Sequence, residues 1–541
     1  MACHLELPFE VDILIGLASD LWALTSAWAR SDSIPNLGAM WKQFLCKLPR
    51  KSSKSDASGS NVTTSSNGKP IHRTSSGSLV PSRSTTVKRT ASSIFPSSVV
   101  TSIEPLLLFK DVPNTEKQNL LINKLNLCYV IFDFSDPNKN SAEKDMKRQA
   151  LLDIIDYVDT GGSRFTEPTI AAICKMFASN LFRVFPPNTR SSTGGVETEE
   201  EEPVFEPAWS HLQLVYDLLL KFIESSSLDA KIAKKYVDHT FIVRLLHLFD
   251  SEDPRERDCL KAILHRVYGK FMAHRPFIRK MISNVFYQFM FETNRHNGIA
   301  ELLEVFGSII SGFALPLKEE HKLFLCKVLI PLHKPKTLGI YHQQLTYCVI
   351  QFVEKEPKLV TSVLNGLLRY WPVINSQKEV MFLSELEEIL ETTNDVDIQK
   401  CVLPLFRRVG CCINSSHFQV AERALLMCNN DRVINLVSHN RQVVMPLILP
   451  ALERNILTHW NQGVLNLTQN VNKVLCEMDE ELFLACKRNF EEEETKQELT
   501  EQNRRMAWEY LETAAAFQPV TRNVAVLVKP VISPPVVAAL S

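Results

Sequence analysis

Between residues 105 and 517 the chain repeats apolar residues at positions i, i+3, i+4 and i+7, in segments of about ten to twenty residues. Pro, Gly, Asn or acidic turns separate the segments. This spacing places apolar side chains on one face of a helix, and no alternating pattern of useful length suggests a strand. The sequence therefore predicts an all-α fold. The clearest helical segments are 208–224, 241–250, 299–310, 319–333, 379–391 and 418–427.

Similar apolar helix ends recur along this region, and each is followed by a polar turn and a second helix. Their intervals fit units, or pairs of units, of roughly 40 residues. A two-helix unit of that length cannot bury its apolar face alone, so neighbouring units must stack. Stacking predicts an α-solenoid with a concave inner surface. The recurring ends are LHLF (246–249), IPLH (330–333), LPLF (403–406) and LPAL (449–452).

Composition agrees with a helical chain. With 541 residues the chain is too long for one compact core, and 17 glycines are too few for folds rich in strands and turns. The net charge of -1 gives no argument for a nucleic-acid or membrane partner, and no apolar run reaches the roughly 18 residues of a membrane span. The 13 cysteines have no regular spacing, which indicates free thiols in a reducing compartment. We therefore expect a cytoplasmic or nuclear chain.

The residues before the helical region have a different composition. Between Trp41 and Val100 there are ten Lys or Arg and one acid, and large apolar groups are scarce. Such a segment buries too little surface to offset its ordering entropy. The expected organisation is an N-terminal extension of uncertain role over 1–39, a disordered basic Ser/Thr-rich segment over 40–103, the solenoid over 104–517 and a flexible tail over 518–541.

Two helix boundaries have capping signals. Asp253 precedes Pro254 at the first helical position, and Glu256 follows at the third, which predicts a capping box. Gly312 and Pro316 are expected to end one helix before the next begins.

The chain lacks the usual signatures of catalysis. GxSxG, GxxxxGK[ST], HExxH and the kinase motifs are absent, and Cys and His do not occur in pairs with metal-binding spacing. We therefore expect no enzyme active site, no metal and no cofactor. The acidic run 197–207 is expected to be a solvated loop, or alternatively to face a basic partner or a cation. The run 489–505 predicts a solvent-facing helix with paired charges.

Residues 253–280 accumulate cations among apolar residues. On a helix, four of these side chains form one stripe, and two further arginines lie close to it. Later segments supply two aliphatic residues one turn apart with an acid alongside, and then another cation and a histidine. The stripe comprises Lys261, His265, Tyr268 and Arg275, with Arg266 and Arg279 nearby, and the later residues are Glu304, Val305, Ile309, Lys318 and His321.

If stacked repeats bring these segments together, they form an apolar groove with cations along its rim. Such a groove suits an extended peptide whose aliphatic side chains enter the groove and whose carboxylate is held by Arg and His. The alternative is that the cations only pair with neighbouring acids and cap helix ends.

Several blocks of sequence resemble a known family. They are SEDPRERDCLKAILHRVYGKF, HNGIAELLEVFGSIISGFALPLKEEHK, YHQQLTYCVIQFVEK, KEVMFLSELEEILE and HFQVAERAL, in this order. Together they resemble the B-prime regulatory subunits of protein phosphatase 2A over about residues 104 to 512. Residues 40–55 are similar to the usual N-terminus of plant members. The resemblance implies a non-catalytic HEAT-like, armadillo-type solenoid that docks on the phosphatase scaffold and catalytic subunits and recruits substrates.

The family's groove binds short Leu-x-x-Ile-x-Glu segments of substrate proteins. The resemblance implies that His265 and Arg266 hold the ligand Glu, and that Tyr268, Val305 and Ile309 form the apolar floor. It also implies that Lys318 and His321 lie on the side of the ligand Leu. Arg275 and Arg279 would attract acidic or phosphorylated flanks of the peptide, and Glu304 would orient the cations.

The helical pattern allows another interpretation of the chain. A free-standing solenoid adaptor or transport receptor would have the same helical pattern. The segment LEEILE (386–391) fits the ligand pattern itself, but its spacing predicts a helix packed in the core.

Overall fold

The structure is a computed structural model that describes residues 104–134, 136, 138–161, 165–185 and 203–516. The chain divides into two compact units, Met1–Thr86 and Val87–Ser541. The first unit lies outside the described residues. The predictions for 1–39, 40–103 and 518–541 likewise fall outside the described residues.

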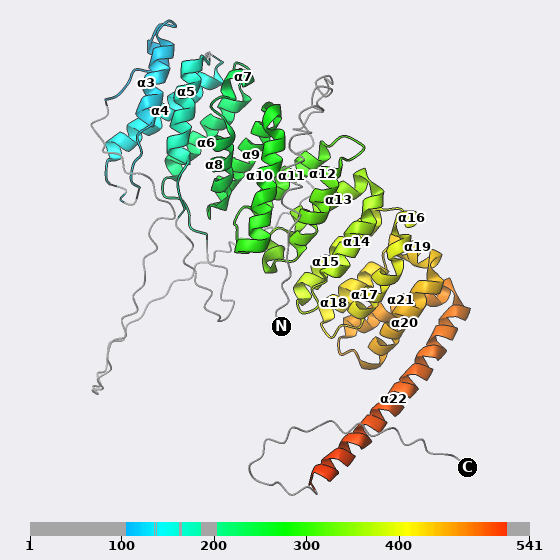
Figure 1. Cartoon of the computed structure of the whole chain (residues 1–541). Coiled ribbons are helices and arrows are strands. Elements are labelled where there is room, and N and C mark those ends of the chain that lie inside the picture. The colour runs from blue at the N-terminus through cyan, green and yellow to red at the C-terminus, as the bar shows by residue number, and fades with distance from the viewer. Residues whose placement is uncertain (1–103, 135, 137, 162–164, 186–202, 517–541) are drawn as a thin grey trace, which may run out of the picture. The chain divides into compact units, whose positions relative to one another are not determined.

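The described residues form helices and contain no β-strand, which confirms the all-α prediction (Figure 1). The α-helices are α3 Lys117–Cys128, α4 Ser141–Asp159, α5 Glu167–Leu181, α6 Trp209–Glu224, α7 Ala230–Ala233, α8 His239–His247, α9 Pro254–Lys270, α10 Arg275–Gln288, α11 Ile299–Ser311, α12 Glu319–Phe324, α13 His342–Lys355, α14 Val360–Arg369, α15 Ser376–Thr392, α16 Asp395–Ile398, α17 Val402–Ile413, α18 Phe418–Cys428, α19 Asp431–His439, α20 Arg441–Thr458, α21 Gln462–Met478 and α22 Glu480–Ala516.

Shorter helical turns connect some of these elements. The 3₁₀ turns are η2 Phe109–Asp111, η3 Leu248–Asp250, η4 Met272–His274, η7 Pro331–His333, η8 Lys336–Ile340, η9 Pro357–Leu359 and η10 Gln399–Cys401, and the π-helical turns are η5 Phe289–Thr293 and η6 Leu325–Leu329.

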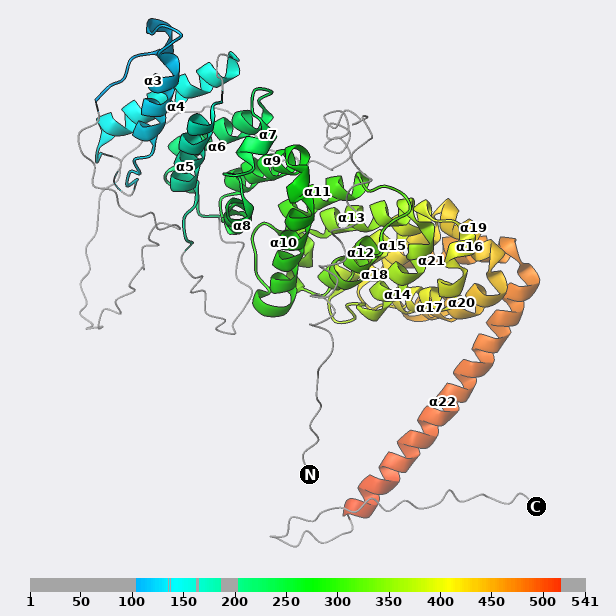
Figure 2. The same ribbon diagram turned by 45° about the horizontal axis from the view of Figure 1, so that its top comes forward.

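The helices pack in two layers. One layer runs through α4, α6, α9, α11, α13, α15, α18 and α21, each packed on the next. The other layer includes α3 on α5, α8 on α10, and the series α14, α17, α20 and α22. Figures 1 and 2 show the helices following one another in chain order from α3 to α21. Apolar side chains fill the space between the layers, as a solenoid requires.

Polar contacts between neighbouring repeats confirm the repeat length of roughly 40 residues. Arg257 on α9 pairs with Glu301 on α11 at 2.8 Å, across 44 residues of sequence. Near the other end, Asn455 donates to the Ile413 carbonyl oxygen at 2.8 Å, across 42 residues. Each repeat therefore lies directly beside the next one in the sequence.

Helix positions agree well with the sequence pattern. The segment 208–224 forms α6, 299–310 forms α11, and 379–391 lies within α15. Leu386 and Ile389 are fully buried, so LEEILE is a core segment as predicted. Segment 319–333 is divided between α12 and the turns η6 and η7, and is not one regular helix.

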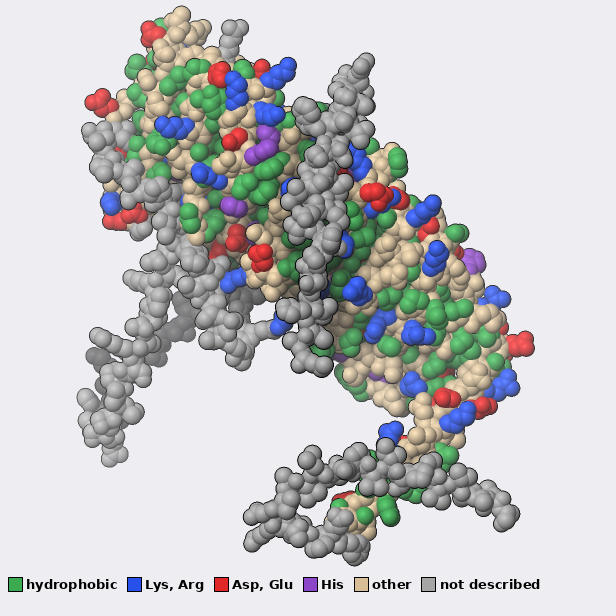
Figure 3. Space-filling view, viewed as in Figure 1, with side chains coloured by type: hydrophobic (Ala, Val, Ile, Leu, Met, Phe, Trp, Pro, Cys, Tyr) green, Lys and Arg blue, Asp and Glu red, His purple; other side chains and the backbone are tan. Residues whose placement is uncertain are grey.

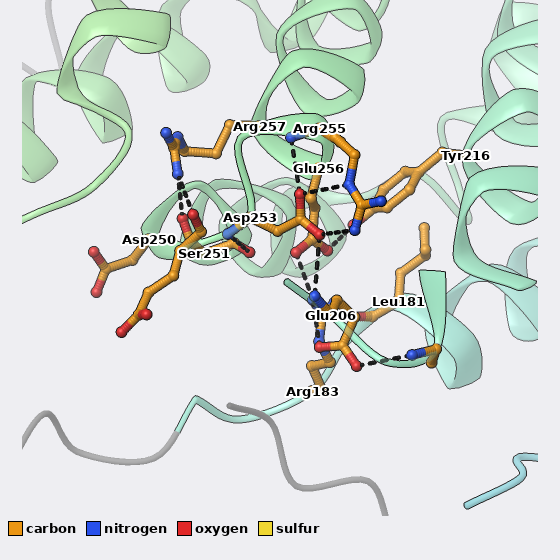
Figure 4. A network of polar contacts seen from close by, with 12 residues as sticks. Leu181, Arg183, Glu206, Tyr216, Asp250, Ser251, Asp253, Arg255, Glu256 and Arg257 are labelled. Atoms are coloured by element: carbon orange, nitrogen blue, oxygen red, sulfur yellow. Dashed lines mark hydrogen bonds and ion pairs between the residues drawn. The ribbon is translucent and has the colours of Figure 1, made fainter. Parts of the chain in front are cut away.

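The predicted capping box at α9 is only half right. Asp253 does cap the helix, because its carboxylate accepts from the Arg255 amide at 3.0 Å. Glu256 does not reach back to the Asp253 amide, which donates to the Ser251 hydroxyl at 3.3 Å. Glu256 is fully buried and points toward Arg183 and Tyr216 (Figure 4). A charged partner in the neighbouring repeat competed with the local cap.

That partner is Arg183, just after α5. Its guanidinium lies 2.5 Å from one oxygen of Glu256, and the Tyr216 hydroxyl donates to the other oxygen at 2.5 Å. Glu206 lies 3.5 Å from the same guanidinium. Burial lowers the pKa of Arg183, but Glu256, Tyr216 and Glu206 raise it by more, so the network keeps a buried positive charge.

Glu206 also corrects the interpretation of the acidic run. Residues 197–202 lie outside the described residues, but Glu206 is buried, not solvated. Its amide donates to Asp253 at 3.1 Å, so the end of the run is bound to the start of α9. The buried guanidinium of Arg183 needs a nearby acid at this position, and the sequence pattern could not predict where that guanidinium would lie.

Among the described residues, the structure has no helix long and apolar enough to cross a membrane.

Candidate peptide-binding site

The predicted site residues come from four consecutive helices. α9 contributes Lys261, His265, Arg266 and Tyr268, and α10 begins at Arg275. α11 carries Glu304, Val305 and Ile309, and Lys318 is the N-cap of α12. α9 packs on α11, and α10 packs on α11. The stacking therefore places the three segments of the prediction on neighbouring elements.

Arg275 does not belong to the helical stripe that the sequence suggested. α9 ends at Lys270, and η4 separates it from α10. Pro276 explains the break, because its ring nitrogen has no N–H to bond within a continuing helix and it fits the first turn of a new one. The interpretation of Lys261 to Arg275 as one stripe on one helix is therefore wrong.

Arg275 nevertheless contacts Tyr268. Its Nε donates to the Tyr268 carbonyl oxygen at 2.9 Å, and its guanidinium lies 5.2 Å from the centre of the Tyr268 ring. Arg279, one turn along α10, donates to the Tyr268 hydroxyl at 3.2 Å. Tyr268 thus has one arginine at its backbone and ring and a second at its hydroxyl.

Arg279 also connects α10 to α12. Its guanidinium lies 3.3 Å from Glu320, and the same carboxylate oxygen lies 3.2 Å from His321 Nε2. The His321 ring stacks on Phe313 with centroids 3.6 Å apart and planes 3° apart. The hydrogen bond from His321 and the charge of Arg279 hold the pKa of Glu320 below its usual value, despite partial burial. We call Tyr268, Arg275, Arg279, Glu320 and His321 the cation cluster.

Glu304 is the acid that orients a separate cation. Lys261 Nζ lies 2.6 Å from its carboxylate, and the Gln344 amide donates to it at 3.3 Å. Burial lowers the pKa of Lys261, but Glu304 outweighs burial and the net pKa is raised. Glu304 therefore holds Lys261, and the structure shows no contact between its described side chain and the cation cluster. The orienting role that the resemblance implies for Glu304 stays a prediction.

Three further predicted polar residues, besides Lys261 and Glu304, lie outside this cluster. Arg266 pairs with Glu224 at the end of α6 at 2.7 Å, and both side chains are about half exposed. His265 is partly buried, and burial together with the neighbouring Arg266 lowers its pKa. Lys318 is exposed at the start of α12. In this structure Arg266 faces the repeat before α9, whereas Arg279 and His321 face the repeat after it.

The predicted apolar floor lies below the surface. Val305 is fully buried and Ile309 is 4% exposed. These two side chains can support a groove from below, but they offer little surface to a ligand here. Apolar surface near the cation cluster comes instead from Phe313, which is partly exposed, and from Leu315, which is 64% exposed.

Two residues of this site were missed from the sequence. Glu320 was not singled out in the sequence, although it holds both Arg279 and His321. Phe313 was not singled out either, although it fixes the His321 ring. The signal that could have found Glu320 is its position directly before His321, but only the fold shows that Arg279 lies opposite.

A cavity of about 330 Å³ lies elsewhere, between the start of α11 and η8. Its lining includes Arg257, Arg295, His296 and Tyr341, and none of the predicted site residues. Among the described residues, no group of three or more His, Cys, Asp or Glu side chains is placed to hold a metal ion. Figure 3 shows charged side chains dispersed among apolar ones on one face of the helices, with no large single-sign field in that view.

The cation cluster can therefore hold a carboxylate. Glu320, an acid of the chain itself, already occupies the space between Arg279 and His321, and charge-assisted hydrogen bonds of this kind are among the stronger polar contacts in proteins.

Comparison with known proteins gives the family. Residues 106–515 match the family described as protein phosphatase 2A regulatory B subunits of the B56 type. The B' kappa isoform of the 57 kDa regulatory subunit of serine/threonine protein phosphatase 2A from Oryza sativa subsp. japonica is 68% identical over 497 residues, covering 90% of this chain and 98% of the relative. The B' kappa isoform from Arabidopsis thaliana is 62% identical over 494 residues, covering 91% and 99%.

Among solved structures, an engineered protein matches 70% of this chain and 89% of its own, with a TM-score of 0.31 and 10% identity. That likeness adds nothing to the helix packing described above. The family match covers most of the described helices, and the relatives are named as regulatory and not catalytic subunits. The chain belongs to the B56 family and is a regulatory subunit of protein phosphatase 2A, not an enzyme.

Proposed function

We propose that this chain docks on the scaffold and catalytic subunits of the phosphatase and recruits substrates through a groove for Leu-x-x-Ile-x-Glu-type peptides between α9 and α12. Family membership supports the partners, since a regulatory subunit acts within a phosphatase 2A complex. Recruitment raises the local substrate concentration near the catalytic subunit without any new chemistry.

The observation that carries the peptide site is the pair of contacts made by Glu320. Its carboxylate lies between Arg279 and His321, on the side of α9 where Tyr268 and Arg275 also lie. The acidic flank of a peptide in the groove would meet the same donors, and aliphatic anchors would meet Phe313 and Leu315.

Arg266 requires a side-chain movement under this proposal. Its present partner, Glu224, is a surface acid, and exposed pairs of this kind contribute only about 0–1 kcal/mol. The guanidinium can therefore leave Glu224 at little cost and turn to a ligand carboxylate. We expect the free and peptide-bound forms to differ in this rotamer while the backbone changes little.

Calorimetry with a Leu-x-x-Ile-x-Glu peptide tests the proposal. Arg266→Ala should weaken binding by at least about 1.5 kcal/mol, because a charged hydrogen-bond partner is lost. Arg441→Ala is the matched control, since Arg441 is also about half exposed and pairs through Nε with one acid, Asp479, at 2.8 Å. Unchanged peptide affinity in Arg266→Ala would place the ligand carboxylate elsewhere.

Gel filtration with purified scaffold and catalytic subunits tests assembly separately. The wild-type chain and the Arg266→Ala variant should both co-elute with the two subunits. Failure of the wild-type chain to co-elute would instead favour a free-standing solenoid adaptor.

A further inference from the structure

Three cations from consecutive repeats lie around two adjacent aromatic residues, at α14 and α17. Lys334 Nζ and the Arg369 guanidinium lie 5.5 Å and 5.8 Å from the centre of the Tyr370 ring. The Arg408 guanidinium lies 5.8 Å from the centre of the Trp371 ring. Lys334 follows η7, Arg369 ends α14, and Arg408 lies within α17. Figures 1 and 2 show α14 and α17 next to each other, and the two helices are in contact.

None of these three cations makes an ion pair or a side-chain hydrogen bond within the described residues. The segments that carry them, 321–353, 357–378 and 398–421, contain no Asp or Glu. The next helix of the same layer differs, because Arg454 on α20 pairs with Glu494 at 2.9 Å. The positive charge around the aromatic pair is therefore not balanced by acids in its own segments.

Glu379, near the start of α15, is the acid that contacts the aromatic pair. Trp371 Nε1 donates to its carboxylate at 2.8 Å, and the residue is only 8% exposed. Burial raises the pKa of Glu379, and the hydrogen bond from Trp371 and the charges of Arg408 and His417 lower it by less. Glu379 is therefore bound below the surface, and the exposed groups of this region are cations.

The helix dipole explains only part of this arrangement. A cation in the last turn of a helix is favoured by the dipole, and Arg369 is the last residue of α14. Arg408 lies five residues before the end of α17, and Lys334 follows a turn of only three residues. The dipole effect is confined to the terminal turn of a helix, so it does not account for three cations around one aromatic pair.

The aromatic pair leads into a turn that exposes two aliphatic side chains. Val373 is 63% exposed and Ile374 is fully exposed. The turn is held at its end, because the Asn375 amide donates to the Pro372 carbonyl oxygen at 2.9 Å and the Asn375 side chain accepts from the Lys378 amide at 3.0 Å. The turn therefore presents an aliphatic pair close to the three cations.

We propose that this surface binds a phosphorylated Ser or Thr segment of a partner protein. The cations hold the phosphate, and an aliphatic residue beside it packs on the exposed pair. We call this surface the phosphate patch, and its residues are Lys334, Arg369, Tyr370, Val373, Ile374 and Arg408.

Charge complementarity selects this occupant. A phosphoserine carries about two negative charges and three strong acceptor oxygens, which suit clustered Arg and Lys donors better than a single carboxylate does. The three cations lie around one point, whereas a nucleic acid or a membrane needs cations spread along an extended surface. The proteins on which a serine/threonine phosphatase acts carry such phosphates. The phosphate patch is also separate from α9–α12, so it provides a second contact beyond the proposed peptide groove.

Fluorescence anisotropy with short labelled peptides tests the proposal on the full chain. The probes have a central phosphoserine with Ile or Ala on each side, and none contains a Leu-x-x-Ile-x-Glu sequence. The wild-type chain should bind the phosphorylated Ile peptide at least about tenfold more tightly than its unphosphorylated form. Lys334→Glu combined with Arg369→Glu should remove that difference. A wild-type chain without any preference for the phosphorylated peptide overturns the proposal.

The matched control is Lys358→Glu with Lys400→Glu. Both lysines are exposed, have no ion pair within the described residues and lie just before α14 and α17, at least about two helical turns from Arg369 and Arg408. The net charge changes equally, so this variant should keep the preference for phosphoserine, and circular dichroism should show unchanged helicity in both variants. Equal losses in the two variants overturn the proposal, because binding would then depend only on net charge.

The aliphatic contact and the membrane alternative are tested separately. Ile374→Ser should reduce the preference for Ile over Ala beside the phosphoserine, and an unchanged preference overturns the role of the aliphatic pair. Vesicles of phosphatidylserine and phosphatidylcholine are the probe for a membrane. Co-sedimentation with these vesicles that is lost in the Lys334→Glu, Arg369→Glu variant, without phosphopeptide binding, overturns the proposal in favour of an anionic membrane surface.

Discussion

The two halves of α9 use charged residues in opposite ways. At its start, Glu256 is fully buried and its two carboxylate oxygens are bound by Arg183 and Tyr216. Toward its end, Arg266 is about half exposed and holds only a surface acid. The first arrangement joins repeats and leaves no polar atom accessible to a ligand, whereas the second leaves the hydrogen-bond donors of Arg266 near the surface. The comparison shows that charge type does not distinguish a structural network from a binding site; burial and satisfied partners do.

The largest expected effect comes from removing the buried acid. Glu256→Ala leaves the Arg183 guanidinium buried without its nearest counter-charge, and breaking a buried pair in this way costs about 3–5 kcal/mol. Urea unfolding should show this loss. Glu224→Ala, which removes only the surface partner of Arg266, should change stability by no more than about 0.5 kcal/mol. Equal effects of the two substitutions would remove the distinction between the halves of α9.

A second contrast is between the side of the site that carries Arg266 and the side that carries Arg279. Arg279→Ala removes the donor that contacts both Tyr268 and Glu320, and should weaken an acidic peptide by about 1.5 kcal/mol while changing stability little. Arg279→Ala should weaken the binding of a peptide without its acidic flank by less than it weakens the binding of the full-length peptide, because Arg279 is proposed to attract that flank. Calorimetry with full-length and truncated peptides measures the difference. Equal losses for both peptides would show that Arg279 does not contact the flank.

The sequence could predict the helices but not these partners. Apolar spacing located α6, α11 and α15 because each of these helices buries one continuous face, and the spacing of apolar residues shows directly which positions share that face. It could not predict that Glu256 would turn away from its own helix end, since Arg183 lies 73 residues earlier and only stacking brings the two together. Long-range charge pairs have no local periodicity.

The candidate site shows the same limit. The residue pattern and the family resemblance together supplied the site residues, and the structure places them on neighbouring helices. Pro276 could have indicated the helix break from the sequence, but the role of Glu320 is visible only in the fold. The pattern treated Lys261 to Arg275 as one stripe because a period of 3.6 continues through any sequence on paper. A proline within the first turn of α10 ends that continuity physically.

Two histidines extend the comparison to pH. Burial lowers the pKa of His333, but Glu385, whose carboxylate lies 3.0 Å away, raises it by more. His333 therefore contributes stability below its unfolded pKa of about 6.5, and this contribution is lost as the pH rises through the raised folded value. Burial, with Arg266, lowers the pKa of His265, so its contribution has the opposite sign and stability falls as the pH drops below about 6.5.

Urea unfolding from pH 5 to 9 separates the two residues. His333→Gln should remove the loss of stability on the alkaline side, and His265→Gln should remove the loss on the acidic side. A pKa that differs by one between the folded and unfolded chain changes the free energy of unfolding by up to about 1.4 kcal/mol. Unaltered pH profiles in both variants would show that these histidines do not titrate with folding.

The smallest expected effect tests whether Glu320 competes with the ligand. Its carboxylate occupies Arg279 and His321 in the free protein, so Glu320→Gln should release both donors and strengthen an acidic peptide by about 0.2–1 kcal/mol, the range of exposed ion pairs. Glu319→Gln removes the same charge one residue earlier, where the acid pairs with Lys322 at 3.2 Å and not with the cation cluster. Calorimetry should show a gain in the first variant beyond that in the second. Equal gains would mean that the peptide senses only net charge, and that the cation cluster has no particular place for its acid.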